Sequence, residues 1–171
     1  MKYYTSAEAA KLLRKLNDER EALLDKERRS SIFMAAVGED VESVRPAYIY
    51  ADTQAALDKL DAQIRVVKHA INRFNTTQVV PGFGMTIDQM LVYIPQLTAQ
   101  KRKLGEMKNR LPRQRENTDR FGRTNSIIDY SYANYDIGEV EHDYDTVSDE
   151  LAKAQTALDV INSVETMEIG L

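Results

Sequence analysis

The chain has 171 residues, a formal net charge of −4, and no cysteine or tryptophan. This length suits one domain, and seven glycines with four prolines are too few for a turn-rich β-sandwich or barrel. The lack of cysteine excludes disulfides, thiolate zinc sites and a cysteine nucleophile. The acidic balance supplies no general attraction to nucleic acid or anionic lipid. We therefore expect a helical, cytoplasmic protein with no membrane partner.

Helical patterns recur along the chain and predict four long helices. Two of them begin with a capping box, in which Thr5 precedes Glu8 and Thr86 precedes Gln89 by three residues. The predicted helices cover about residues 5–30, 53–75, 86–111 and 140–163. Together they predict an all-α fold of long antiparallel hairpins, forming a bundle within one domain, residues 1–171.

Two of the predicted helices carry an apolar seam whose residues step by three and four positions. The first seam is Leu57, Leu60, Ile64, Val67, Ile71 and Phe74; the second is Tyr144, Val147, Leu151, Ala154, Leu158 and Ile161. Such a seam fits an ordinary antiparallel bundle within one chain. It equally fits hairpins that pair between subunits, and on that basis we predict a homo-oligomer whose partner is the chain itself.

Two connections are rich in tyrosine and predict extended structure. Residues 47–51 combine aromatic and β-branched side chains, and residues 124–138 alternate Ile128, Tyr130 and Tyr132 with polar residues. The two segments are expected to pair as a small β-ribbon that caps the bundle. An isolated two-stranded ribbon is marginal in water, so this ribbon should lie on helices or on another subunit.

Arginine, tyrosine and asparagine concentrate next to each other in the second half of the chain. Residues 101–123 hold nine Lys or Arg against three acids, whereas residues 124–171 hold eleven acids and one lysine. The candidate ligand-binding residues are Arg113, Arg115, Arg120, Arg123, Asn125, Tyr130, Tyr132, Asn134 and Tyr135. Arginine binds phosphate bidentately and tyrosine stacks on bases, which suits a small nucleotide-like anion. In the plainer alternative the arginines pair with the acidic last helix; the net charge argues against nucleic acid as a partner.

No residue pattern supports catalysis, a cofactor or a metal. The histidines, His69 and His142, lie on different predicted helices. Carboxylates near His142 are accounted for by the positive end of a helix dipole, and they lack the glycine and ligand spacing of a calcium loop. We therefore expect a protein that is not an enzyme.

Several short motifs in a fixed order resemble the septicolysin-type family of bacterial and phage proteins, over roughly residues 8–168. The motifs are Ala70-Ile71-Asn72-Arg73-Phe74-Asn75-Thr76, Gly84-Met85-Thr86-Ile87, Arg120-x-x-Arg123 and Leu158-Asp159-x-Ile161-x-x-x-Val164. This chain has Asn162-Ser163 where family members tend to have Asn-Trp. The resemblance implies a mostly helical, self-associating protein, and it supplies no catalytic residues.

These observations predict a non-enzymatic, oligomeric binding protein. In its most concrete form, the protein sequesters a small anionic nucleotide in a cleft lined by arginine, tyrosine and asparagine. The alternative is a structural or adaptor protein that acts through coiled-coil-like self-association or through partner helices.

Overall fold

The computed structural model describes residues 2–115 and 129–171. The chain is mainly helical with small antiparallel sheets, which confirms the predicted fold class at that level. The sequence predicts a single domain, and the described residues form two compact units. Unit 1 is Met1–Gln78 with Asp159–Leu171, and unit 2 is Val79–Leu158.

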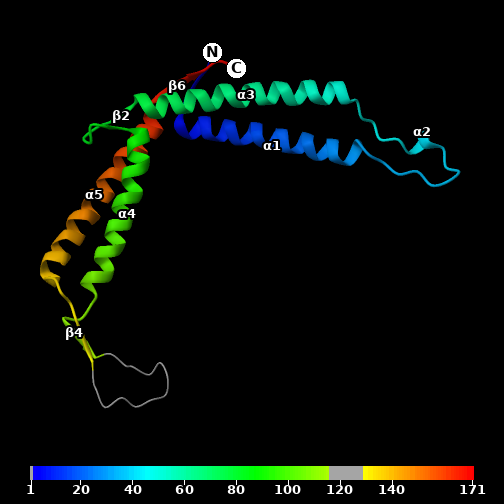
Figure 1. Ribbon diagram of the computed structural model, residues 1–171. Helices are drawn as coiled ribbons and strands as arrows, with labels where there is room; N and C mark the ends of the chain where they lie inside the picture. Colours follow the sequence, from blue (N-terminus) through cyan, green and yellow to red (C-terminus); the bar gives the residue numbers. More distant parts are fainter. Residues whose placement is uncertain (1, 116–128) are drawn as a thin grey trace, which may run out of the picture. The chain divides into compact units, whose positions relative to one another are not determined.

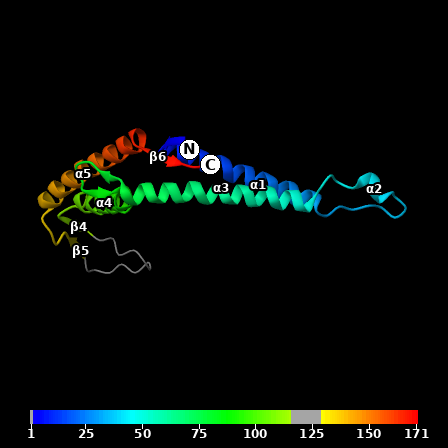
Figure 2. The ribbon, with the colours of Figure 1, turned by 90° about the horizontal axis from the view of Figure 1, so that it is seen from above.

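Unit 1 is built on a long helical hairpin formed by α1 (Ser6–Ser30) and α3 (Tyr50–Thr77) (Figures 1 and 2). The predicted capping box begins α1. The Thr5 amide donates to the Glu8 carboxylate at 2.8 Å, and the Glu8 amide donates to Thr5 Oγ1 at 3.3 Å. Two of the four unpaired amides at the helix start are thereby satisfied, which explains why α1 begins where the sequence predicts.

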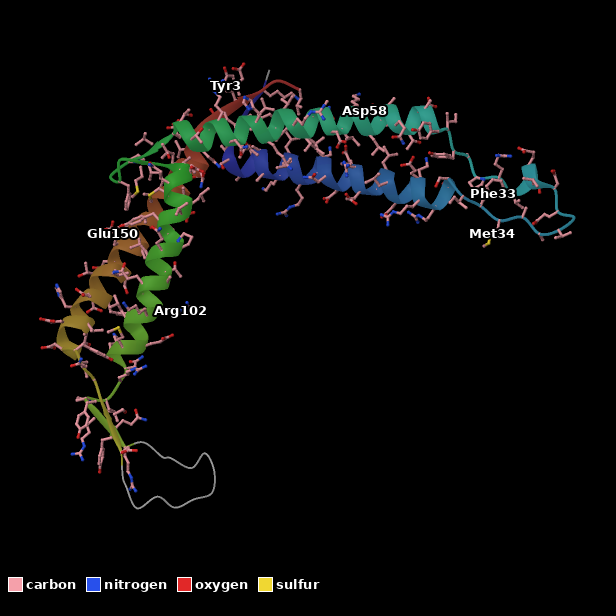
Figure 3. The ribbon with its side chains drawn as sticks, in the orientation of Figure 1. Tyr3, Phe33, Met34, Asp58, Arg102 and Glu150 are labelled. Atoms are coloured by element: carbon pink, nitrogen blue, oxygen red, sulfur yellow. The ribbon has the colours of Figure 1, made fainter. Side chains whose placement is uncertain are left out.

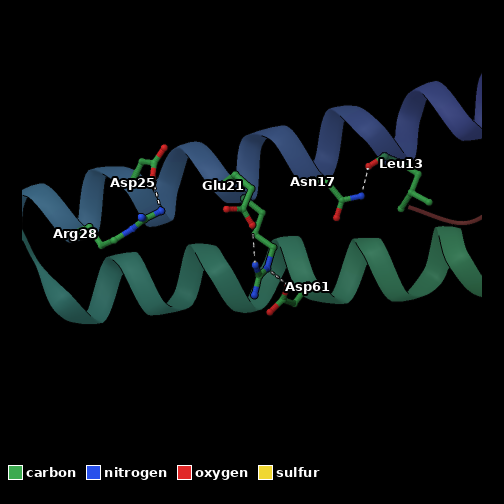
Figure 4. A network of polar contacts seen from close by, with 7 residues as sticks. Leu13, Asn17, Glu21, Asp25, Arg28 and Asp61 are labelled. Carbon is green, nitrogen blue, oxygen red and sulfur yellow. Dashed lines mark hydrogen bonds and ion pairs between the residues drawn. The ribbon is translucent and has the colours of Figure 1, made fainter. Parts of the chain in front are cut away.

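The first apolar seam forms much of the core of this hairpin. Leu57, Ile64, Val67 and Phe74 are buried, and Leu60 and Ile71 are half-buried. Beside the core, Arg20 of α1 donates to Asp61 of α3 at 2.7 Å (Figure 4). The seam therefore finds most of its cover within one chain, as the bundle interpretation expects.

The two ends of the described chain pair with each other in unit 1. Strand β1 (Lys2–Thr5) runs antiparallel to β6 (Thr166–Ile169), with Tyr4 opposite Met167 and Lys2 opposite Ile169. Met167 and Ile169 are buried, while Glu168 between them is exposed. This alternation places one face of the ribbon against the helices. The sequence does not predict this ribbon.

The loop between α1 and α3 corrects the prediction of a strand at residues 47–51. Tyr50 and Ala51 already belong to α3, and a single-turn helix, α2 (Val41–Val44), precedes them. Among the described residues this segment pairs with no strand, and Tyr48 instead donates its hydroxyl to Glu27 at 2.7 Å. Gln54 donates to the same carboxylate at 2.8 Å. These bonds fasten the end of the loop to α1.

The Tyr48–Glu27 contact predicts a pH dependence. The hydrogen bond to Glu27, aided by burial and by the Glu27 charge, raises the pKa of Tyr48 from 10.0 to about 12. Because this pKa is raised in the folded state, the contact stabilises the protein fully below pH 10 and is lost as the pH rises to about 12. Ultraviolet titration of the tyrosines should show a late step that Tyr48→Phe removes. A late step unchanged by Tyr48→Phe would contradict the assignment.

Unit 2 begins with a short hairpin, in which β2 (Val79–Val80) pairs with β3 (Met85–Thr86). Gly82 and Gly84 in its turn have φ of 84° and 63°, a region that side chains other than glycine rarely adopt. Thr86 and Gln89 then form the second predicted capping box and begin α4 (Ile87–Lys108). Asn109 caps α4, so this helix ends three residues before the predicted limit.

Helix α5 (Ile137–Val164) lies alongside α4 in both views (Figures 1 and 2). Tyr93 donates to Glu150 at 3.3 Å, and the absent side chain of Gly105 leaves room for the ring of Tyr144. The second seam is buried at Val147, Leu151, Ala154, Leu158 and Ile161, whereas Tyr144 is half-buried. The Asp136 carboxylate accepts from the Gly138 and Glu139 amides, so α5 begins earlier than predicted.

Among the described residues, no helix combines the length and the apolar character that a membrane crossing requires.

Candidate functional site

The candidate site is a two-stranded ribbon that joins the end of α4 to the start of α5 in unit 2. Strand β4 (Arg113–Arg115) pairs antiparallel with β5 (Tyr130–Tyr132). The prediction of extended structure is confirmed at 130–132, and residues 124–128 of that segment lie outside the described part. The predicted pairing of this segment with residues 47–51 is wrong, because β5 pairs with the arginine-containing strand β4.

The strand register brings four of the predicted ligand-binding residues onto one face. Arg113 lies opposite Tyr132, and Arg115 lies opposite Tyr130. Because side chains alternate across a strand, all four share a face, and Gln114 and Ser131 occupy the other. We call Arg113, Arg115, Tyr130 and Tyr132 the Arg/Tyr face.

Stacking holds the Arg/Tyr face in order. The Arg113 guanidinium lies 3.7 Å from the ring centroid of Tyr130 and 5.9 Å from that of Tyr132. Such a cation over an aromatic face is attracted by the negative potential of the ring. All residues of both strands are exposed, with Tyr130 40% and Tyr132 65% accessible. The face is therefore preformed and open to solvent.

The remaining predicted ligand-binding residues have other placements. Tyr135 is half-buried and donates its hydroxyl to the Met107 carbonyl at 2.9 Å, so it holds β5 close to the end of α4. Asn134 is exposed just beyond β5. Arg120, Arg123 and Asn125 lie outside the described residues, and their contribution to the site stays a prediction.

The basic end of α4 contacts an aromatic ring of α5. Lys108 Nζ lies 4.0 Å and Lys101 Nζ 5.6 Å from the ring centroid of Tyr144. Within residues 101–115 and 129–171, no Lys or Arg forms an ion pair with a carboxylate at 4.0 Å or less. Among the described residues, the guanidinium groups of Arg113 and Arg115 thus have no carboxylate partner at this distance.

A hollow lies in unit 1, between the end of the α1–α3 loop and the hairpin. It measures about 570 Å³ and is lined by Leu23, Lys26, Arg45, Pro46, Tyr48 and Ile49, among others. Arg45 there forms an ion pair with Glu42 at 2.7 Å. Its cations and carboxylates are mixed, so it offers no concentrated charge of one sign. The part of the chain that the structure describes holds no group of three His, Asp or Glu arranged to bind a metal ion.

Comparison with known proteins yields a likeness of fold. No model of a protein family and no curated protein matches the chain. The structure is similar to the crystal structure of a functionally unknown conserved protein from Corynebacterium diphtheriae, with a TM-score of 0.58 and 17% sequence identity. The match covers 98% of this chain and 100% of the other. At this identity the likeness extends to the fold alone.

Proposed function

We propose that the protein is a non-enzymatic binding protein, and that the Arg/Tyr face binds a small anionic ligand of the nucleotide type. The observation that carries the proposal is the shared placement of Arg113, Arg115, Tyr130 and Tyr132 on one exposed ribbon face. The predicted residues Arg120, Arg123 and Asn125 follow β4 in the chain and are proposed to complete the site.

Each residue type of this face suits one part of a nucleotide. A guanidinium presents several N–H donors in a plane and binds phosphate bidentately. A tyrosine ring offers a flat surface on which a base stacks, a contact typically worth about 1–3 kcal/mol. Stacking of Arg113 on Tyr130 reduces the freedom that the guanidinium loses on binding, which favours affinity.

The proposal requires both the phosphates and the base of the nucleotide, so ligands that carry only one of them provide a direct test. Isothermal titration calorimetry would compare ATP, inorganic tripolyphosphate and adenosine as probes. ATP should bind tightest, because it engages arginine and tyrosine together. At a concentration 100 times its dissociation constant it should stabilise the fold by about 2.7 kcal/mol, measured as a thermal shift. Equal binding of ATP and tripolyphosphate would exclude a role for the tyrosines.

Arg113→Ala should raise the dissociation constant for ATP by about ten- to a hundredfold, because a hydrogen-bonded cation is lost. The matched control is Arg65→Ala, which removes the same charge from an exposed position on α3. Equal weakening by both variants would show that net charge alone governs binding, and the assignment to the Arg/Tyr face would fail.

We further propose that the protein associates with itself. The seams contribute little to that proposal, since they are mostly buried within one chain. This also weakens the alternative of a structural or adaptor protein acting through exposed coiled-coil seams. Membership of the septicolysin-type family is likewise a proposal, supported by the motif order and by a mainly helical fold.

A further inference from the structure

A run of apolar residues, all exposed except the half-buried Phe33, follows α1 in unit 1. The run is Ile32–Val37, which we call the apolar tip, and it contains no charged side chain. Ile32 is 82% and Met34 93% accessible, and Val37 is fully exposed. Figure 3 shows Phe33 and Met34 on the loop beyond the end of α1. Apolar residues exposed in such a cluster mark an interaction surface.

Several contacts hold the apolar tip in a defined conformation. The Arg45 guanidinium lies 5.2 Å from the ring centroid of Phe33. The Ala36 amide donates to the Glu39 carboxylate at 2.9 Å, and the Glu39 amide donates to the Ala36 carbonyl at 3.1 Å. At the start of the run, the Ser31 amide donates to the Glu27 carbonyl at 2.8 Å. The apolar side chains are therefore presented by an organised loop.

Charges flank the apolar tip with opposite sign on its two sides. Arg28, which pairs with Asp25 of its own helix, and Arg29 precede it, and Glu39 and Asp40 follow it. A two-fold axis through the tip would set apolar residues of one copy against apolar residues of the other. The same axis would place the arginines of each copy opposite the carboxylates of its neighbour. Such self-complementarity is what a symmetric contact between identical chains requires.

We propose that the apolar tip is a homodimer interface, docked antiparallel on the same segment of a second copy of this chain. The flanking carboxylates disfavour an anionic lipid surface as the occupant, because its negative potential repels them. They favour a second copy, which brings its own arginines. The hollow of about 570 Å³ beside the loop, partly lined by Leu23, Pro46 and Ile49, adds apolar surface that a neighbour can cover.

The first test removes apolar side chains from the tip. The double variant Ile32→Ser with Met34→Ser should raise the dimer dissociation constant at least about tenfold, since a symmetric interface loses each side chain twice. Sedimentation velocity over micromolar concentrations measures it. The fold should survive, because both residues are exposed. The matched control is Leu91→Ser with Val92→Ser, which alters exposed apolar residues of α4 and should leave the dimer intact.

The second test uses charge reversal and mixing. One variant carries Arg28→Glu with Arg29→Glu, and the other carries Glu39→Lys with Asp40→Lys. Each alone should be monomeric, because like charges then face each other across the axis. Their equimolar mixture should restore a dimer, since one copy is then acidic and the other basic on both flanks. Glu39→Lys also removes the carboxylate that accepts from the Ala36 amide, so Glu39→Gln, which keeps an acceptor oxygen, is the control for the loop and should still dimerise. Circular dichroism of each variant checks that the helices are intact.

Four outcomes would overturn the proposal. The first two are a wild type that stays monomeric at high micromolar concentration and a dimer that survives Ile32→Ser with Met34→Ser. The other two are a dimer that the α4 control variant dissociates and charge-reversed variants that form no mixed dimer. A monomer that sediments with vesicles of anionic lipid through the tip would assign the surface to a membrane instead. ATP titration of the same samples tests the proposed nucleotide binding independently of dimerisation, because the tip variants leave the Arg/Tyr face unchanged.

Discussion

Replacement of Phe74 by alanine should lower the free energy of unfolding by about 3–5 kcal/mol, the usual cost of deleting a buried aromatic side chain. Phe74 is 4% accessible near the end of α3, and it lines a small hollow together with Met167 of β6. Its loss leaves a cavity that the helix cannot close without moving the strand. Urea unfolding followed by circular dichroism measures the change.

Val66→Ala provides the control for this prediction. Val66 belongs to the same helix but is 41% accessible, so its truncation should change the free energy of unfolding by less than about 1 kcal/mol. Similar values for the two variants would contradict the assignment of this seam to the core of the chain.

The strand β6 should contribute as strongly to stability as a helix seam. Met167→Ala and Ile169→Ala should each lower the free energy of unfolding by about 2–5 kcal/mol, because both side chains are buried. The ribbon with β1 has only two strands, so its stability depends on the contact of this face with the helices. Thermal and urea unfolding of the single variants measure the loss.

Glu168→Ala is the matched control, since Glu168 lies between these residues and faces solvent. It should leave the free energy of unfolding within about 0.5 kcal/mol of the wild type. If Met167→Ala and Ile169→Ala were equally mild, β6 would be a peripheral strand and the described packing of unit 1 would be incorrect.

The helices were predictable because their signals are local. Thr5 with Glu8 and Thr86 with Gln89 satisfy amides within one turn, so the sequence alone locates both helix starts. The seam on α3 predicted its buried face because helical periodicity depends only on spacing.

The strand pairings were not predictable from local signals. Strand β1 pairs with residues at the opposite end of the sequence, and neither strand exceeds four residues. Residues 47–51 have β-forming side chains, yet no strand in the described part of the chain pairs with them, and Tyr48 bonds to Glu27 of α1. Strand propensity without a partner does not make a strand, because the stability of a sheet comes from cross-strand pairs.

The candidate site was predictable in composition but not in arrangement. Tyrosine and arginine are adjacent in the sequence, but the register that sets Arg113 opposite Tyr132 depends on how β4 and β5 pair. Composition places Tyr135 among the ligand-binding residues, but its hydroxyl donates to the Met107 carbonyl. The sequence does not indicate which carbonyl a tyrosine hydroxyl will donate a hydrogen bond to.

The most direct measurement is a titration of ¹⁵N-labelled protein with ATP, followed by two-dimensional NMR. If the Arg/Tyr face binds ATP, the largest changes in amide chemical shift should fall on β4 and β5, residues 113–115 and 130–132. Arg113→Ala should suppress these changes, whereas Arg65→Ala should not. Changes confined to other parts of the chain, or no change at millimolar ATP, would contradict ATP binding at this face.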